Sequence, residues 1–401
     1  MSSFLLMRSN FVKNFGQSLL SLSFNLFGIL AGTLLVLNFD VLSLAKWSFV
    51  LFPGILSVRG SIGGVLSGRL STALQLGTIR VSFLKNTRRF HIIIYTIVLL
   101  TLESSLVLGL FSSFFTTIFL HTSFYDFIAI QSIITATMGF SLLLISPLTY
   151  AISIVSFKQG LNPDVVTYPI ISTVADVLVT LSYVFFLKLY FATTLFGTYT
   201  VWIICLIFFV LALYFSLQVL REREAFKTVR EFSLTLILVV FIVTITGTFF
   251  EKISHIIGLK PEIYLVYPAL IDTVGDVGSI VGSTTTTKLA LGSLNALPNS
   301  VQGYLIEISS PWIASITLFI LYTIISSFIA GINVETNFIR FVSQLLITNL
   351  LAVSLITSLS FLIAVLTYKR GWDPDNFVIP LESSLADGIT TMSLLIALTI
   401  L

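Results

Sequence analysis

Four aspartates lie within apolar stretches of this sequence. Asp176 is near the middle of YPIISTVADVLVTLSYVFFL, and Asp387 holds the matching place in IPLESSLADGITTMSLLIAL. Asp272 and Asp276 are four residues apart and therefore share one face of a helix. A carboxylate costs about 2.5–3.5 kcal/mol at the centre of a membrane helix on insertion scales, so its presence indicates a functional site. We expect these four residues to be metal ligands.

The composition indicates a membrane protein. Of 401 residues, 56% are hydrophobic and only 10% are charged, with a mean hydropathy of +1.04, whereas soluble proteins carry about 25% charged residues. Apolar stretches long enough to span a bilayer recur along the whole chain. The predicted fold class is an all-α polytopic membrane protein with about eleven spans, the first running roughly from Gly16 to Phe39.

The span near Tyr264–Ala290 carries Asp272 and Asp276 together with helix-weakening residues, Pro268 among them. We expect breaks in this helix that offer backbone carbonyl oxygens beside the carboxylates. Hard divalent cations take oxygen ligands, and Mg²⁺ uses one or two carboxylates while keeping several waters. The alternative is that each aspartate only bonds a neighbouring helix.

The chain contains an internal repeat. An offset of 215 residues lays FPGILSVRGSIGGVLSGRLSTALQLG on YPALIDTVGDVGSIVGSTTTTKLALG without a gap, and places Gly32 on Gly247. An offset of 211 residues lays GLNPDVVTYPIISTVAD on GWDPDNFVIPLESSLAD, which places Asp176 on Asp387. Two ordered matches at nearly one offset indicate a duplication.

The repeat sets the expected topology. Residues 1–192 form a first five-helix repeat, residues 193–230 a linker span with a charged cytoplasmic loop, and residues 231–401 a second five-helix repeat. The extra span makes the two repeats parallel, related by a pseudo-two-fold axis along the membrane normal. The positive-inside rule predicts a multi-pass protein of the cell membrane with a cytoplasmic N-terminus and an outside C-terminus.

Asp176 and Asp387 are expected to face one another across this axis. Both cannot be ionised cheaply unless a cation lies between them, although a shared proton is an alternative. Asp272 and Asp276 have no acidic counterparts in the first repeat, so the expected site is only pseudo-symmetric. Further pore-lining candidates are Ser172, Ser383, Gly275, Thr284 and Arg69.

At these residues the chain resembles the MgtE family of magnesium transporters, in the two-repeat form of the solute-carrier magnesium transporters. The resemblance rests on the first-repeat glycine-rich segment with its RLSTA run, and on NPDVVTYPIISTVADVLVTLSYVFFL. It implies a five-span unit, a pore between two units, and a pore-facing aspartate at Asp176 and Asp387. The family's Gly-Asn pair is replaced here by Gly60-Ser61 and by Gly275-Asp276. The cytoplasmic sensor domains of larger members are absent from this sequence.

We therefore expect a transporter of divalent metal cations, Mg²⁺ first and Mn²⁺, Co²⁺ or Zn²⁺ otherwise, with its path between the repeats. The expected partners are membrane lipid and the transported cation, with one chain sufficient because it holds both repeats. A proton- or Na⁺-coupled transporter of another solute, using the same aspartates, is the alternative. A membrane scaffold or intramembrane enzyme is a third reading. No nucleophile–base set, phosphate loop or nucleic-acid motif occurs, so we expect no enzyme, no prosthetic group and no nucleic-acid partner.

Overall fold

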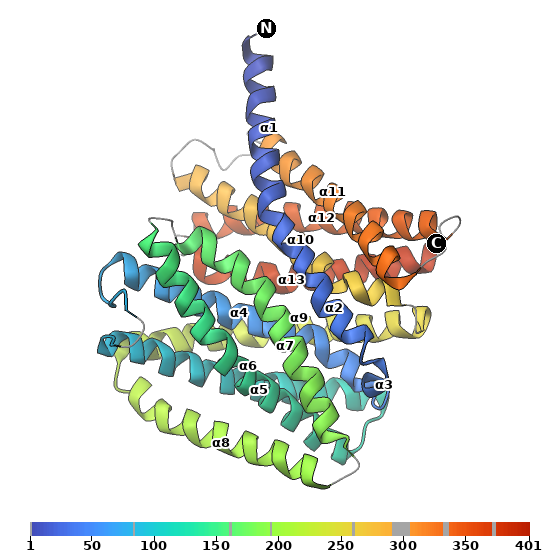
Figure 1. Cartoon of the computed structure of the whole chain (residues 1–401). Helices are drawn as coiled ribbons and strands as arrows, with labels where there is room; N and C mark the ends of the chain where they lie inside the picture. Colours follow the sequence, from blue (N-terminus) through green and yellow to red (C-terminus); the bar gives the residue numbers. More distant parts are fainter. Residues whose placement is uncertain are drawn as a thin grey trace. The chain divides into compact units, whose positions relative to one another are not determined.

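In the computed structural model the described residues are 2–82, 85–159, 163–192, 195–258, 261–290, 305–331, 337–370 and 374–401. Regular secondary structure among them is helical throughout. Eleven helical segments in these ranges are long and apolar enough to cross a membrane. The predicted class, an all-α polytopic membrane protein, is therefore confirmed (Figure 1).

The helices follow one another in a simple order along the chain. They are α1 (Ser2–Leu22), the 3₁₀ helix η1 (Ser23–Phe27), α2 (Gly28–Val36), α3 (Phe39–Leu42), α4 (Trp47–Gln75), α5 (Arg88–Leu120), α6 (Phe124–Lys158), α7 (Pro163–Tyr190), α8 (Leu195–Val219), α9 (Arg223–Ile257), α10 (Pro261–Ala290), α11 (Leu305–Ala330), α12 (Asn337–Lys369) and α13 (Pro374–Ile400).

The chain divides into two compact units. Unit 1 contains Met1–Val36 and Lys252–Leu401, and unit 2 contains Leu37–Glu251. Each unit thus combines four helices of one sequence repeat with the first helix of the other repeat. The division into sequence repeats stays a prediction about the origin of the chain, whereas the units describe how its helices pack.

In unit 2, α4 is the central helix. It packs on α5, α6 and α7, and 78% of its most apolar window is buried. Its side chains explain this position, because α4 carries small residues among its apolar ones and can approach its neighbours closely. The linker helix α8 instead lies at the edge, against α5 and α6, with only 17% of its window buried. A helix this apolar and this exposed is suited to contact with lipid.

In unit 1, α10 has the same central role. It packs on α2, α11, α12 and α13. The contact with α2 is close at Gly32, where a Cβ atom would lie 2.1 Å from the carbonyl oxygen of Leu265. In unit 2, Gly247 of α9 meets α4 in the same way, with a built Cβ 2.0 Å from the carbonyl oxygen of Val50. The offset of 215 residues relates the two contacts.

The helix breaks expected in α10 do not occur, and α4 is unbroken as well. Both are continuous helices, with Pro53 inside α4 and Pro268 inside α10. Proline removes one backbone donor, and packing in a helix bundle supplies the stability that tolerates this loss. Glycine serves for close approach instead, because a Cβ on Gly275 would stand 3.7 Å from the Cβ of Ala386 on α13. Backbone carbonyls freed by breaks are therefore not available as ligands.

The first span differs from its prediction in one respect. The helical path from Asn14 to Val36 is long and apolar enough to cross a membrane, as expected, but the 3₁₀ helix η1 divides it. A 3₁₀ turn rotates the side-chain pattern relative to an α-helix. Its buried residue is Asn25, which the periodicity of the sequence did not single out.

Candidate cation-binding residues

Asp276 of unit 1 has a defined hydrogen-bond partner. The side-chain amide of Asn25 donates to Asp276 Oδ2 at 2.8 Å, and Asn25 is 3% exposed. This amide orients the carboxylate and supports its negative charge without cancelling it. The carboxylate of Asp276 is therefore held in a fixed orientation.

Next to Asn25, two buried hydroxyl groups of α10 and α11 are hydrogen-bonded to one another. Thr273 Oγ1 donates to the carbonyl oxygen of Ala269 at 2.7 Å, which makes the Tyr322 hydroxyl, 2.7 Å away, the donor to Thr273. Thr273 and Tyr322 are both fully buried. Asp272 lies one turn before Asp276 on the same continuous helix and is half-buried. The two aspartates thus share one face, as predicted from their spacing.

Asp387 stands on α13, the helix that packs against this region of α10. It is 6% exposed, and its backbone carbonyl accepts a hydrogen bond from Thr391 Oγ1 at 2.7 Å. The Tyr267 hydroxyl of α10 lies 2.8 Å from the same Thr391 oxygen. Because Gly275 and Ala386 are in contact, each of the acids Asp276 and Asp387 directly follows a contact residue.

Glu382 is a further buried acid of unit 1. It is 0% exposed, and Ser279 Oγ donates to its Oε2 at 3.1 Å. Its Oε1 has no hydrogen-bond partner among the described residues. This oxygen lies 2.0 Å from where a Cβ of Gly278 would be. The carboxylate is therefore packed directly against the backbone of α10, in space that glycine leaves free.

Asp176 belongs to unit 2, on α7. It is 6% exposed, and its backbone carbonyl accepts from Thr180 Oγ1 at 2.7 Å. The Tyr183 hydroxyl of α7 donates to the carbonyl oxygen of Ser48 on α4 at 2.7 Å. The structure thus places Asp176 and Asp387 in different units, at matched positions of their repeats. That they face one another stays a prediction.

The two arginines of α4 have different surroundings. Arg59 is 1% exposed, and its Nε, Nη1 and Nη2 atoms have no hydrogen-bond partner in the described part of the chain. Arg69 is exposed, and its Nη2 donates to Thr228 Oγ1 of α9 at 2.7 Å. Arg69 thus ties α9 to α4 in unit 2, at the end of α4 away from Gly247 and Val50.

The other lining candidates are less informative. Ser172, Ser383 and Gly275 are half-buried. Thr284 is also half-buried, and its hydroxyl donates to the carbonyl oxygen of Ile280 at 2.6 Å. Within the described ranges no three His, Cys, Asp or Glu side chains are grouped so as to hold a metal ion. The described acids therefore form a dispersed set on packed helices.

Three residues of this region were missed by reasoning from the sequence: Asn25, Thr273 and Tyr322. Asn25 offered the only signal, an amide within the apolar run SFNLFG. Thr273 and Tyr322 resemble ordinary polar residues of membrane spans, and their connection becomes visible only once α10 and α11 are packed together.

These features define an α-helical, multi-pass membrane protein with carboxylates inside its spans. The family model for the MgtE divalent cation transporters matches residues 52–186 and 267–397. The matched segments start 215 residues apart and end 211 residues apart, which are the two offsets of the internal repeat. Because the match covers more than half of the chain, this protein belongs to the MgtE divalent cation transporter family.

The other comparisons add little. A search of curated proteins gives no match. Among solved structures, the crystal structure of a eukaryotic MATE transporter, AtDTX14, is 13% identical, with 97% of this chain and 96% of that chain covered. Its TM-score is 0.22, too low for an argument about fold. Family membership makes a divalent cation the substrate rather than a cofactor and indicates a transporter rather than an enzyme.

Proposed function

We propose that this protein carries Mg²⁺ across the cell membrane, and that Asp272, Asp276 and Asp387 of unit 1 and Asp176 of unit 2 hold the ion. The observation that supports the proposal most is the contact between Gly275 and Ala386, with Cβ positions 3.7 Å apart. It brings α10 and α13 together one residue before Asp276 and one residue before Asp387.

The donor types suit Mg²⁺. This ion needs near-octahedral oxygen coordination, dehydrates reluctantly, and is usually held by one or two carboxylates with several waters. A dispersed set of acids fits a hydrated ion better than a complete protein cage would. The amide of Asn25, 2.8 Å from Asp276, keeps one carboxylate oriented while leaving its charge available.

The remaining parts of the proposal come from the sequence. The path lies between the two repeats, the N-terminus is cytoplasmic and the C-terminus lies outside. One chain is sufficient for transport because it holds both repeats. Mn²⁺, Co²⁺ and Zn²⁺ are the other cations whose transport should be compared with that of Mg²⁺.

The proposal is tested by Mg²⁺ flux into proteoliposomes that contain purified protein. Asp176→Asn and Asp387→Asn should each abolish flux when equal amounts of protein are reconstituted, because the amide keeps the shape of the side chain but removes its charge. Asp40→Asn is the control, since Asp40 is an exposed carboxylate in the short helix α3. Unchanged flux in both variants would contradict the assignment, and transport that strictly follows a pH or Na⁺ gradient would favour a coupled transporter.

A further inference from the structure

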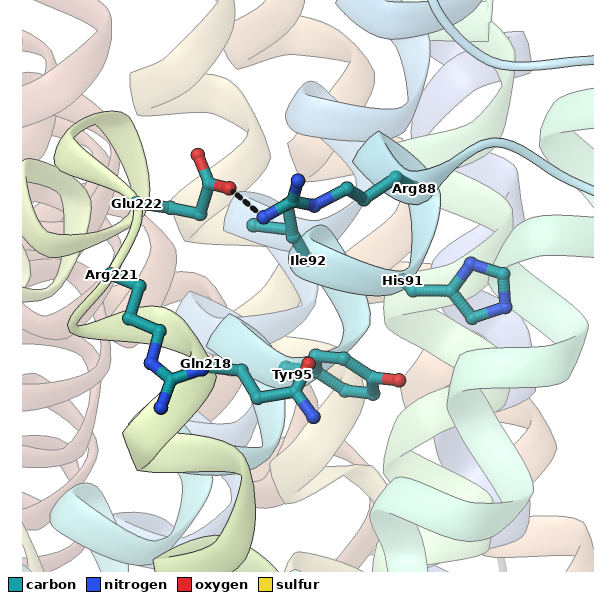
Figure 2. A pocket seen from close by; sticks show the side chains of 7 residues that line it. All are labelled: Arg88, His91, Ile92, Tyr95, Gln218, Arg221 and Glu222. Atoms are coloured by element: carbon teal, nitrogen blue, oxygen red, sulfur yellow. Dashed lines mark hydrogen bonds and ion pairs between the residues drawn. The ribbon is translucent and has the colours of Figure 1, made fainter.

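A polar pocket lies in unit 2, and none of the four aspartates lines it. Its volume is about 420 Å³, and it is lined by the first two turns of α5 and by the end of α8 with the residues that follow it. The lining residues are Arg88, His91, Ile92, Tyr95, Gln218, Arg221 and Glu222. The spacing of the α5 residues places them on one face of that helix, and Gln218 at the end of α8 together with Arg221 and Glu222 of the following turn lies opposite this face (Figure 2).

The pocket carries a positive charge that its own residues do not balance. Arg88 Nη2 and Glu222 Oε1 form an ion pair at 2.7 Å on one wall. Arg221 is a second cation, and its side chain has no ion pair among the described residues. His91 Nδ1 lies 2.9 Å from the carbonyl oxygen of Thr87 and donates to it, which ties the ring to its own helix. This arrangement suits an anion with several oxygen atoms.

An aromatic contact joins the two helices beside the pocket. The rings of Tyr95 on α5 and Phe215 on α8 stack, with centroids 4.3 Å apart and planes 9° apart. Helix α8 also exposes a stripe of apolar side chains at helical spacing that ends shortly before Arg221: Leu206, Val210, Leu213 and Leu217. A ligand with a charged head and an apolar body would have a matching surface for both parts.

The surroundings identify this ligand. Both α5 and α8 are apolar enough to cross a membrane, and α8 is the least buried of the eleven spans. The pocket lies at the end of these spans where the positive-inside rule places the cytoplasm. Anionic lipids concentrate in the cytoplasmic leaflet, and basic pockets between membrane helices bind their head groups. We propose that this pocket binds the phosphate of an anionic phospholipid, with an acyl chain along the exposed stripe of α8.

Arg221 and Arg223 provide a matched pair for the test. Both are exposed arginines of the charged run that follows α8, but only Arg221 lines the pocket. Purified protein would be incubated with vesicles of phosphatidylcholine alone or with phosphatidylglycerol added, and retained lipid would be counted by native mass spectrometry. Wild-type protein and Arg223→Gln should retain phosphatidylglycerol, whereas Arg221→Gln should bind it roughly fivefold to tenfold more weakly.

A further variant and a competition experiment make the test specific. Arg221→Lys keeps the charge and should retain part of the binding, which covers the case in which Arg221→Gln does not fold. Equal losses of phosphatidylglycerol binding in Arg221→Gln and Arg223→Gln would show diffuse attraction to the charged run and would contradict binding in the pocket. Unchanged binding in Arg221→Gln would overturn it as well. If soluble glycerol phosphate displaces bound phosphatidylglycerol as effectively as the lipid itself does, the ligand is a free phosphate compound and not a lipid.

Discussion

Gly32 on α2 lies against Leu265 on α10, so close that a Cβ atom on the glycine would stand 2.1 Å from the leucine carbonyl oxygen. Gly247 on α9 and Val50 on α4 form the corresponding contact in the other unit, at 2.0 Å. Each contact joins the first helix of one sequence repeat to the second helix of the other repeat. The two repeats therefore exchange their first helices.

Alanine at these glycines should destabilise the protein. In both Gly32→Ala and Gly247→Ala the new methyl group meets backbone atoms that cannot rotate away, and such overpacking costs about 1–3 kcal/mol. Gly68→Ala is the control, because nothing lies within 4 Å of a Cβ there, and it should be neutral or stabilising by about 0.5–1 kcal/mol. Thermal unfolding in detergent measures all three. Equal melting temperatures would argue against the exchanged packing.

Cysteines at Gly275 and Ala386 should form a disulfide in a background that lacks Cys205. Their Cβ positions are 3.7 Å apart, within the range that disulfides require. The repeat offers a matched control in unit 2, where Gly60 and Ala175 hold the same positions but a Cβ on Gly60 meets nothing within 4 Å. Mobility on non-reducing gels after oxidation should show a cross-link in the first pair alone. Cross-linking of both pairs, or of neither, would contradict the difference between the units.

Asn25 and Asp276 should be energetically coupled. Asn25→Ala removes the donor 2.8 Å from Asp276 Oδ2, and a hydrogen bond to a charged group contributes about 1.5–3 kcal/mol. We expect Asn25→Ala to have lower thermal stability and a lower apparent affinity for Mg²⁺ in transport. Combined with Asp276→Asn, the substitution should cost little more than Asp276→Asn alone. Additive losses in this double-mutant cycle would show that the two residues act independently.

Glu382→Gln should stabilise unit 1. Glu382 Oε1 and Ser360 Oγ are both buried and both crowd the same point beside Gly278, at 2.0 Å and 3.0 Å from where a Cβ would be. A glutamine of the same shape removes the cost of a buried charge and adds an amide donor, worth about 1 kcal/mol. Thermal unfolding would measure the gain. Gly278→Ala, which pushes a methyl group into this carboxylate, should have the opposite effect, and a loss of stability in Glu382→Gln would refute the argument.

Much of this architecture could be predicted from the sequence. The apolar lengths gave the eleven spans, and the spacing of Asp272 and Asp276 gave their common helix face. The offsets that relate Gly32 to Gly247 and Asp176 to Asp387 are the same offsets that separate the two segments of the family match. These features depend on local periodicity and on comparison of the chain with itself, which a sequence contains in full.

The exchange of first helices could not be predicted in this way. Duplication makes Val50 and Leu265 equivalent, so Gly32 has two similar partners in the sequence and only packing chooses between them. Likewise, Pro268 signals a weak point in a helix, but the neighbours of α10 decide whether the helix breaks there. Asn25, which donates to Asp276, lies in the 3₁₀ helix η1, and no residue in that segment encodes a 3₁₀ turn unambiguously.

The exchange also has a consequence for how the chain is made. Helix α2 is synthesised early, but its partner α10 follows more than two hundred residues later. At typical rates of about 5–20 residues per second, α2 waits roughly ten to fifty seconds in the membrane before α10 exists. During that interval α4, which carries the equivalent Val50, is present while the final partner of Gly32 is not. Unit 2, whose last contributing helix is α9, is complete before unit 1 can close.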